Sequence, residues 1–549
     1  MKNRKILLTL LPTLVLALGT LSSCGTTYGS ADTYDLDVNV DTQGVTIQMW
    51  TGFGSAVNST LSEGDECLIA QFEALTGIDV AYETKGGYDG LQTAINLSAT
   101  TINALPQVAN GYPDHMAGYI ASNIQLRLDG LIENDSKRDI QEPGSYEDYN
   151  GNTVTTLPHL DYEDFYSDYT IENETLEFKS NGDGYVLGLP FNKSTEVLAY
   201  NKTFFDFMAT PTGTQLRTTN NVGDIYLPAT WAEVKTVGLN IISLFNKLGL
   251  YGKILGNDGI VYTDASQLAS GVKIVIDALA VTPDTFRPFS YDSTENLVTT
   301  LIRQYGGTLT TVDKTQTGKG YINFNNSITV EALTMLKDLW DNNIFGIAST
   351  PWADSTGYCS NAFKACKSLM NVGSSGGLTN IIPEGNAFQV GVAPIPYVKE
   401  EYKYVLSQGT SLGLFQIDEN DPDREKKLVA AWKLIVFLSQ AENAQFAAGT
   451  GYFPTCESAA NSDTYQTYLS NPLQSAKDIA NQSAANINNS TYNSKTSGWY
   501  KFTDPGFRGS SDIRTQIGLI PGYIFNNTYP TIQAVIDAVC NVLRDYIPQ

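Results

Sequence analysis

Apolar and polar residues alternate in two short segments near the start of the chain, with residues at helical spacing between them. Alternation predicts strands at 45–49 and 78–82, and an apolar run begins a third strand at 105–109. Four residues on one face predict the first helix: Leu68, Ile69, Phe72 and Leu75. Gly77 marks its expected end, and a second helix is predicted around 91–95. This β-α-β-α-β order predicts an α/β fold with a parallel sheet and right-handed crossovers.

Further along the chain, turn and cap residues predict other elements. Asp183-Gly184 predicts a hairpin turn leading into a strand at 185–187. Asp421-Pro422 predicts the start of a helix whose apolar face carries Leu428, Trp432, Ile435 and Leu438. Residues 133–183 form an acidic, aromatic, turn-rich insertion to which the pattern assigns no place. Residues 461–498 are rich in Asn, Ser and Ala, and we expect them to cover the surface.

The first residues have the character of a targeting segment. A basic start precedes an apolar run, 6–18, that is too short to span a bilayer. The run ends in Leu21-Ser22-Ser23-Cys24, which resembles the lipobox of bacterial lipoproteins. We therefore expect a signal peptide at 1–23, lipidation of Cys24 and a flexible tether over 24–43, which would anchor the protein to the outer face of the cell membrane. The alternative is an ordinary signal peptide with a chance cysteine.

The charge balance excludes one class of partner. Once the signal peptide and its three basic residues are removed, 31 Lys+Arg remain against 58 Asp+Glu, a net charge of −27. Nucleic-acid binding needs a basic surface, so we expect no nucleic-acid partner. Charged residues make up only 17% of the chain and tyrosines number 31, a composition that suits clefts for hydroxyl-rich ligands.

Cysteine and histidine usage argues against a disulfide framework and against zinc. Besides Cys24, five cysteines follow the predicted signal peptide, an odd and sparse set that predicts mostly buried thiols: Cys67, Cys359, Cys366, Cys456 and Cys540. The two histidines, His115 and His159, stand far apart, and no Cys-x-x-Cys occurs. We expect neither a metal nor a cofactor.

Four separated segments resemble one protein family. They are 72–80; 188–202, which reads Gly-Leu-Pro-Phe-Asn-Lys-Ser-Thr-Glu-Val-Leu-Ala-Tyr-Asn-Lys and is followed by Pro-Ala-Thr-Trp-Ala-Glu at 228–233; 365–396; and 430–454. In order and spacing they are similar to the extracellular solute-binding proteins that serve carbohydrate-type ABC importers. The resemblance covers about residues 44 to 535.

This resemblance implies a two-lobed, periplasmic-binding-protein-like fold of type II, with the ligand cleft between the lobes at a multi-strand hinge. It implies a first lobe of 44–192 plus 394–452 and a second lobe of 193–393 plus 453–549. It also implies a monomer that performs no catalysis, captures a small sugar or polyol phosphate, and passes it to ABC permease subunits.

Within the family, the chain looks closest to the glycerol-3-phosphate-binding branch. The resemblance implies ligand contacts at Tyr88, Asn192, Ser194, Thr195, Ser375, Gly376, Gly409, Thr410, Tyr452 and Arg508. Arg508 would supply the charged donor for an anion. Tyr112 and Asp114 stand where that branch has a glutamate, and Trp50 either lines the cleft or fills the lobe. A neutral oligosaccharide therefore stays open as the ligand.

An enzyme is the rival interpretation, either a secreted, lipid-anchored esterase or a glycoside hydrolase. Gly373-Ser374-Ser375-Gly376-Gly377 fits the Gly-x-Ser-x-Gly pattern, with Ser375 as nucleophile. Both histidines precede that serine, whereas the histidine of this fold follows it. A glycoside hydrolase needs two facing carboxylates, and no local motif singles out such a pair. The sequence favours a binding protein.

Overall fold

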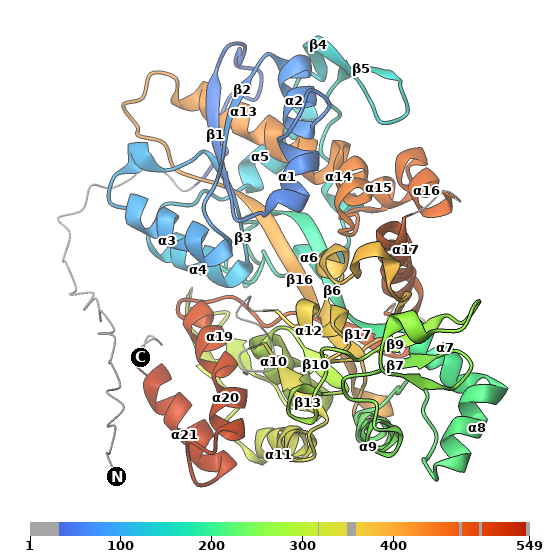
Figure 1. Cartoon of the computed structure of the whole chain (residues 1–549). Helices are drawn as coiled ribbons and strands as arrows, with labels where there is room; N and C mark the ends of the chain where they lie inside the picture. The colour runs from blue at the N-terminus through green and yellow to red at the C-terminus, as the bar shows by residue number, and fades with distance from the viewer. Residues whose placement is uncertain (1–31, 317, 349–357, 472–474, 493–496, 545–549) are drawn as a thin grey trace, which may run out of the picture.

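Two lobes lie on either side of a pair of long strands in the computed structural model (Figure 1). The structure describes residues 32–316, 318–348, 358–471, 475–492 and 497–544. The predicted signal peptide and the lipidation site, Cys24, lie outside the described residues. Among the residues that are described, no helix combines the length and the apolar character that crossing a membrane requires.

The first lobe is built on the predicted parallel strands. β1 (Thr46–Thr51) lies between β2 (Asp79–Thr84) and β3 (Val108–Gly111), parallel to both. The predicted first helix is α2 (Leu68–Thr76), and it ends at Gly77, whose φ of 69° is the left-handed conformation expected there. α3 (Tyr88–Ser98) confirms the second helix. Two apolar clusters enclose this sheet, one on each face.

Two antiparallel strands continue from one lobe into the other. β6 (Leu189–Asn201) pairs with β16 (Lys403–Leu414), and the end of β16 pairs with β3 of the first lobe. The other end of β6 pairs with β14 (Met370–Ser374) and β15 (Val390–Ala393) of the second lobe. A single ten-stranded sheet therefore runs through the molecule, and the crossing strands form the hinge that the resemblance implied.

The second lobe has its own core beneath the parallel strands β10 (Phe289–Tyr291), β13 (Phe345–Ile347) and β14. The further strands are β7 (Ile254–Gly256), β8 (Val261–Tyr262), β9 (Ile274–Asp277), β11 (Thr310–Val312), β12 (Gly320–Ile322) and β17 (Trp499–Phe502). The helices are α7 (Lys202–Ala209), α8 (Pro211–Thr219), α9 (Trp231–Leu248), α10 (Thr294–Gln304), α11 (Ser327–Asp341), α12 (Ser360–Lys364), α17 (Ala476–Asn486), α19 (Ser510–Gly518), α20 (Ile520–Phe525) and α21 (Ile532–Leu543).

Packing at the crossings departs from the predicted lobe boundaries. Ile395 and Val405 lie in the core of the second lobe, because β16 crosses between the lobes later than residue 394. Cys456 and Tyr465 pack in the core of the first lobe, although 453–549 was expected in the second. The chain returns to the second lobe with α17, which follows α14 (Asn443–Thr450), α15 (Glu457–Asn461) and α16 (Asp463–Ser470).

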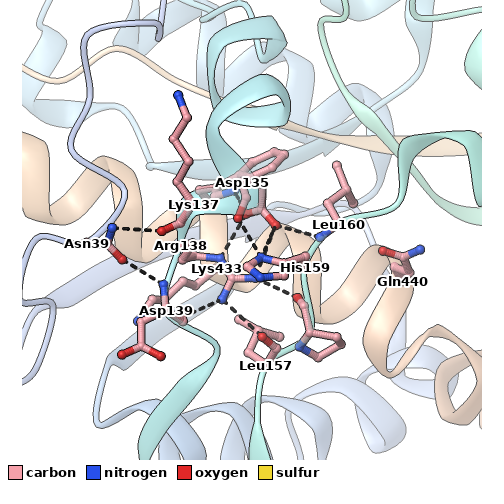
Figure 2. A network of polar contacts seen from close by, with 12 residues as sticks. Asn39, Asp135, Lys137, Arg138, Asp139, Leu157, His159, Leu160, Lys433 and Gln440 are labelled. Carbon is pink, nitrogen blue, oxygen red and sulfur yellow. Dashed lines mark hydrogen bonds and ion pairs between the residues drawn. The ribbon is translucent and has the colours of Figure 1, made fainter.

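The unplaced insertion, 133–183, docks on the first lobe. Its hairpin, β4 (Gln141–Glu147) with β5 (Thr153–Thr156), packs against α2. Asp135 is fully buried at the centre of a polar network (Figure 2). Its carboxylate accepts hydrogen bonds from Arg138 Nε at 2.9 Å and from Trp432 Nε1 of α13 (Arg424–Val436) at 2.7 Å. The insertion is thus fixed to the body of the lobe through a buried charge.

The flexible tether was predicted over 24–43, of which 24–31 lie outside the described residues, and the chain is docked from residue 32 onward. Thr33 is buried and donates to the main-chain oxygen of Arg127 at 2.9 Å. The Asn39 side chain bonds to the main chain on either side of Arg138, at Lys137 and Asp139 (Figure 2). The predicted flexible segment of 32–43 is therefore wrong for these residues.

Three local predictions also need correction. α13 begins at Arg424 rather than at Asp421-Pro422, since the Asp421 carboxylate instead accepts from the Asp423 main chain and pairs with Lys427. The predicted hairpin turn lies earlier, where Gly182 has φ of 89°, and residues 185–187 form no strand. Residues 461–498 are not merely a surface cover, because α17 buries three alanines in the second lobe: Ala480, Ala484 and Ala485.

The further helices of the first lobe are α1 (Ser55–Leu61), α4 (Pro113–Ala121), α5 (Asp129–Asn134) and α6 (Ser167–Thr170). The thiol prediction is confirmed, since Cys67, Cys359, Cys366 and Cys456 are free and buried, and Cys540 is free and half-buried.

Candidate functional site

A cavity of about 1640 Å³ lies between the lobes. Its walls in the first lobe are loops at the carboxyl ends of the parallel strands, 52–57, 84–89 and 112–114. Loops 292–299 and 503–514 contribute from the second lobe, together with the crossing strands. Ligands of open α/β sheets bind beyond the carboxyl ends of the strands, which is where this cavity lies. It is larger than the about 300 to 1,000 Å³ typical of small-molecule pockets.

The cavity brings together most of the predicted ligand residues. Those in its lining are Tyr88, Tyr112, Asp114, Asn192, Ser194, Gly376, Gly409 and Tyr452. They come from both lobes and from both crossing strands. Such an arrangement lets a ligand contact the two lobes at once.

Trp50 lies elsewhere, in the apolar cluster between the sheet and α3. It is only 8% exposed, and Lys85 Nζ lies 3.8 Å from the centre of its ring. Successive side chains of a strand face opposite sides, which sends Trp50 toward α3 and its neighbour Met49 into the other core cluster. The lining begins two residues later, at Gly52.

Thr195, Ser375 and Thr410 are buried and bond within the protein rather than lining the cavity. The Ser375 hydroxyl accepts from the Thr195 main chain at 3.2 Å, and the Thr195 hydroxyl donates to the Leu406 main chain at 2.9 Å. The Thr410 hydroxyl bonds to the Asn192 side chain. These side chains hold the hinge strands together.

The enzyme interpretation loses its nucleophile for the same reason. The Ser375 hydroxyl is engaged with the main chain, and the segment after it, 375–380, is a short 3-10 turn rather than a helix. His159 belongs to the Asp135 network, and His115 packs on α4 beside Tyr112.

Arg508 is exposed and absent from the lining, whereas Arg514 faces the cavity. Arg508 precedes α19, and its main-chain N–H donates to the Gly318 oxygen at 3.2 Å. Arg514 lies within the helix, next to the buried Ile513. Its Nε lies 3.0 Å from Asp114 Oδ2, and its guanidinium is 4.7 Å from the centre of the Tyr112 ring. The arginine that faces the cavity is therefore the first one after the Gly-Phe-Arg-Gly motif rather than the one inside it.

Gly409 sits at the hinge in a conformation that only glycine adopts readily. Its φ is 108°, and a Cβ built there would lie 1.9 Å from the Asn192 main-chain oxygen. A bulge in the pairing of β6 with β16 follows directly, between Thr410 and Ser411. The Asn192 side chain reaches from this bulge to the Tyr88 hydroxyl at 3.2 Å, which links the hinge to a cavity-wall tyrosine.

Three tyrosines form an aromatic wall. The Tyr88 and Tyr112 rings meet edge to face at 4.9 Å, and Tyr452 stacks on Phe446 at 5.9 Å. Burial raises the pKa of the Tyr88 and Tyr112 phenols, so both remain neutral hydrogen-bonding groups at physiological pH. A wall of this kind can stack on a sugar face and bond to its hydroxyls.

Glu172 reaches the cavity from the insertion, although no sequence pattern predicted it as a site residue. Its carboxylate forms a buried ion pair with Lys193 of β6, and Lys193 Nζ also donates to the Gly409 oxygen at 3.3 Å. The Lys193 and Glu172 side chains are 0% and 3% exposed. No motif surrounds Glu172; the only available signal was the acidic, aromatic character of the insertion.

The cavity is acidic. Its lining contains eight Asp or Glu residues and three Lys or Arg residues, and one of the three, Arg514, is already paired with Asp114. Burial raises the pKa of Glu196 to about 7, and its carboxylate accepts from the Tyr291 hydroxyl at 2.5 Å. Among the described residues, no group of three or more His, Cys, Asp or Glu side chains is arranged to hold a metal ion.

The fold matches solved two-lobed binding proteins. The GacH receptor of Streptomyces glaucescens, solved unliganded and with acarbose, is 17% identical; 91% of this chain and 99% of that chain align, with a TM-score of 0.56. UgpB from Mycobacterium tuberculosis, solved with glycerophosphocholine, is 16% identical over 91% and 98%, with a TM-score of 0.59. Lmo0181 from Listeria monocytogenes, solved with cycloalternan, is 15% identical over 91% and 98%, also with a TM-score of 0.59.

Comparison with curated protein sequences finds no match to this chain. The family described as "Bacterial extracellular solute-binding protein" matches residues 67–472, which is more than half of the chain. That span includes both crossing strands and most of the cavity wall. Its members bind solutes rather than transform them, so the chain is a binding protein and not an enzyme. With its two lobes, its crossing strands and its interlobe cavity, the protein belongs to the family of bacterial extracellular solute-binding proteins.

Proposed function

We propose that the protein is the substrate-binding lipoprotein of an ABC importer, and that it captures a carbohydrate or a polyol phosphate between its lobes. The cavity carries this proposal, because its walls come from both lobes and from the strands that join them. A ligand that contacts both lobes favours the closed arrangement over the open one. Permease subunits in the membrane can then distinguish the loaded protein from the empty one.

The proposal also covers the cellular location of the protein and its attachment to the membrane. A lipid on Cys24 would hold the protein at the outer face of the cell membrane. We propose that it acts there as a monomer. Replacement of Cys24 by alanine in the full-length chain should move the protein from the membrane fraction to the soluble fraction, whereas replacement of Cys540 should not. Retention of the Cys24→Ala protein in the membrane fraction would contradict the anchor.

The solved structures of similar fold hold ligands of two classes, a glycerophosphodiester and saccharides. UgpB was solved with glycerophosphocholine, and GacH and Lmo0181 with acarbose and cycloalternan. A glycerol phosphate would fill a small part of a cavity of about 1640 Å³, and the acidic lining repels an anion. The tyrosine wall and the volume both suit a saccharide of several rings.

The test is thermal stability of the protein that begins after Cys24, measured with several ligands. The panel contains sn-glycerol 3-phosphate, glycerophosphocholine, and α- and β-linked saccharides of one to four units. A ligand at 100 times its dissociation constant should add about 2.7 kcal/mol to the free energy of unfolding. A rise in Tm with either class supports the proposal, and no rise with any compound contradicts it.

A further inference from the structure

Three polar side chains of the second lobe line the cavity without belonging to any predicted motif: Thr310, Ser407 and Asp504. Ser407 continues β16 beside the segment that carries Asp504, because Leu406 of β16 pairs with Phe502 of β17. The Thr503 hydroxyl also donates to the Ser407 main-chain oxygen at 3.5 Å. Thr310 opens the β11–β12 hairpin, whose turn contacts the following segment through Gly318 and Arg508.

Each of the three carries a buried polar atom that has no partner in the described part of the chain. Thr310 is 5% exposed and Ser407 is 4% exposed, yet both hydroxyl oxygens lack a hydrogen bond, as does Asp504 Oδ2. A buried polar group without a partner costs about 1–3 kcal/mol. Glu196, elsewhere in the same cavity, differs because Tyr291 and Thr300 both donate to its carboxylate.

The chemistry of these atoms selects a ligand. A hydroxyl group donates or accepts, whereas an ionised carboxylate only accepts. Burial raises the pKa of Asp504 to about 7, and Arg303, which lies outside the lining, opposes that rise and favours the charged form. The O–H groups of a sugar satisfy such a carboxylate, whereas a phosphate brings further acceptors and negative charge to it.

We propose that Thr310, Ser407 and Asp504 form a subsite that binds the hydroxyl groups of an uncharged saccharide unit and discriminates against phosphate. The subsite rests on the proposed function, which it narrows from two ligand classes to one. Adjacent ring hydroxyls would donate to Asp504, while Ser407 and Thr310 bond to the same ring. The preference of the whole protein then follows from this wall of the second lobe together with the acidic lining.

Isothermal titration calorimetry of the protein that begins after Cys24 tests the subsite. The probes are maltotriose, laminaribiose, sn-glycerol 3-phosphate and glycerophosphocholine, extended to whichever saccharide of the stability panel gives the largest shift. The variants are Asp504→Asn and Ser407→Ala, both close to the natural side chains in size. Asp284→Asn removes the same charge from an exposed position of the second lobe outside the cavity, and it serves as the control.

We expect the wild type to bind a saccharide more tightly than either phosphate, and Asp504→Asn to lose about 10- to 100-fold in saccharide affinity. Ser407→Ala should lose less, and Asp284→Asn should match the wild type. Saccharide binding that survives both subsite variants overturns the subsite and leaves the proposed function intact. Tighter binding of a phosphate than of any saccharide by the wild type also overturns the subsite. If the wild type binds none of the probes, the proposed function itself is overturned. Thermal melts of each variant separate loss of binding from loss of folding.

Discussion

Arg514 Nε of the second lobe lies 3.0 Å from Asp114 Oδ2 of the first, so a charged pair joins the lobes at the cavity wall. The Arg514 and Asp114 side chains are 34% and 13% exposed. A second contact nearby, from Gln92 of α3 to Ser511 of α19 at 3.3 Å, also bridges the lobes. The pair therefore favours the closed arrangement.

Asp114→Asn should weaken the closed state, because it removes the charge attraction across the lobes. A loss of about 1 kcal/mol corresponds to about a fivefold weaker affinity for the bound solute. Small-angle scattering of the ligand-free variant should give a larger radius of gyration than that of the wild type. Glu83→Gln, which breaks an ion pair with Lys85 inside the first lobe, should change neither quantity.

The exchange of both charges separates closure from direct ligand contact. Asp114→Arg combined with Arg514→Asp restores opposite charges across the lobes, and it should recover part of the lost affinity. Failure of the double variant to recover any affinity would mean that Asp114 acts on the ligand rather than on the partner lobe.

Gly376→Ala should weaken solute binding through Tyr452. A Cβ at Gly376 would lie 2.6 Å from Tyr452 Cε1, so the ring must leave its place on the cavity wall. We expect about a tenfold loss of affinity by calorimetry, in line with about 1–1.5 kcal/mol for a displaced aromatic contact. Gly522→Ala is the control, since its methyl group would meet no atom within 4 Å and lies outside the cavity. Equal affinity of the Gly376 variant and the wild type would contradict this role of Tyr452.

The buried pair of Lys193 and Glu172 should matter for stability. Removing one partner leaves the other charge buried, which typically costs about 3–5 kcal/mol, so Lys193→Met should lower the urea midpoint strongly. Adding Glu172→Gln should recover much of that loss, because no unpaired charge then remains. Lys202→Met breaks an exposed pair with Asp206 on α7 and should cost less than about 1 kcal/mol. A double variant as unstable as Lys193→Met would contradict this account.

How far the sequence predicts this molecule depends on how local each feature is. The first lobe's strands and α2 are predictable because alternation, helical spacing and Gly77 lie within a few residues of one another. Arg508 and Arg514 are harder, since which of them faces the cavity depends on where α19 begins and how it packs. Glu172 is harder still, because its partner Lys193 belongs to a strand assembled from distant segments.

The same reasoning explains why the aromatic and glycine residues of the cavity wall could be predicted from the sequence, whereas the polar subsite could not. The resemblance to the glycerol-3-phosphate-binding branch implied ligand contacts at Tyr88, Tyr452 and Gly409, and all three line the cavity. Thr310 and Ser407 are of common residue types, and no motif surrounds them. They become candidates only because their hydroxyl groups are buried without a hydrogen-bond partner, which the sequence alone does not reveal.

Glu442 makes the free energy of unfolding depend on pH, with a sign opposite to the dependence that a salt-bridged carboxylate gives. It precedes α14 and accepts a hydrogen bond from the Tyr146 hydroxyl of β4, and burial raises its pKa to about 7. In the unfolded chain a glutamate titrates near 4.3. Between about pH 4.3 and 7 the folded state therefore keeps a proton that the unfolded state has lost, so the free energy of unfolding falls as pH rises.

Glu442→Gln should remove this dependence, because the amide stays neutral and its oxygen still accepts from Tyr146. The variant should match the wild type near pH 4 and exceed it near pH 8 by on the order of 1–3 kcal/mol, measured by urea unfolding at each pH. The comparison at pH 4 is the internal control, since both side chains are then neutral. A stability difference that is the same at both pH values would show that Glu442 ionises in the folded protein as it does in the unfolded chain.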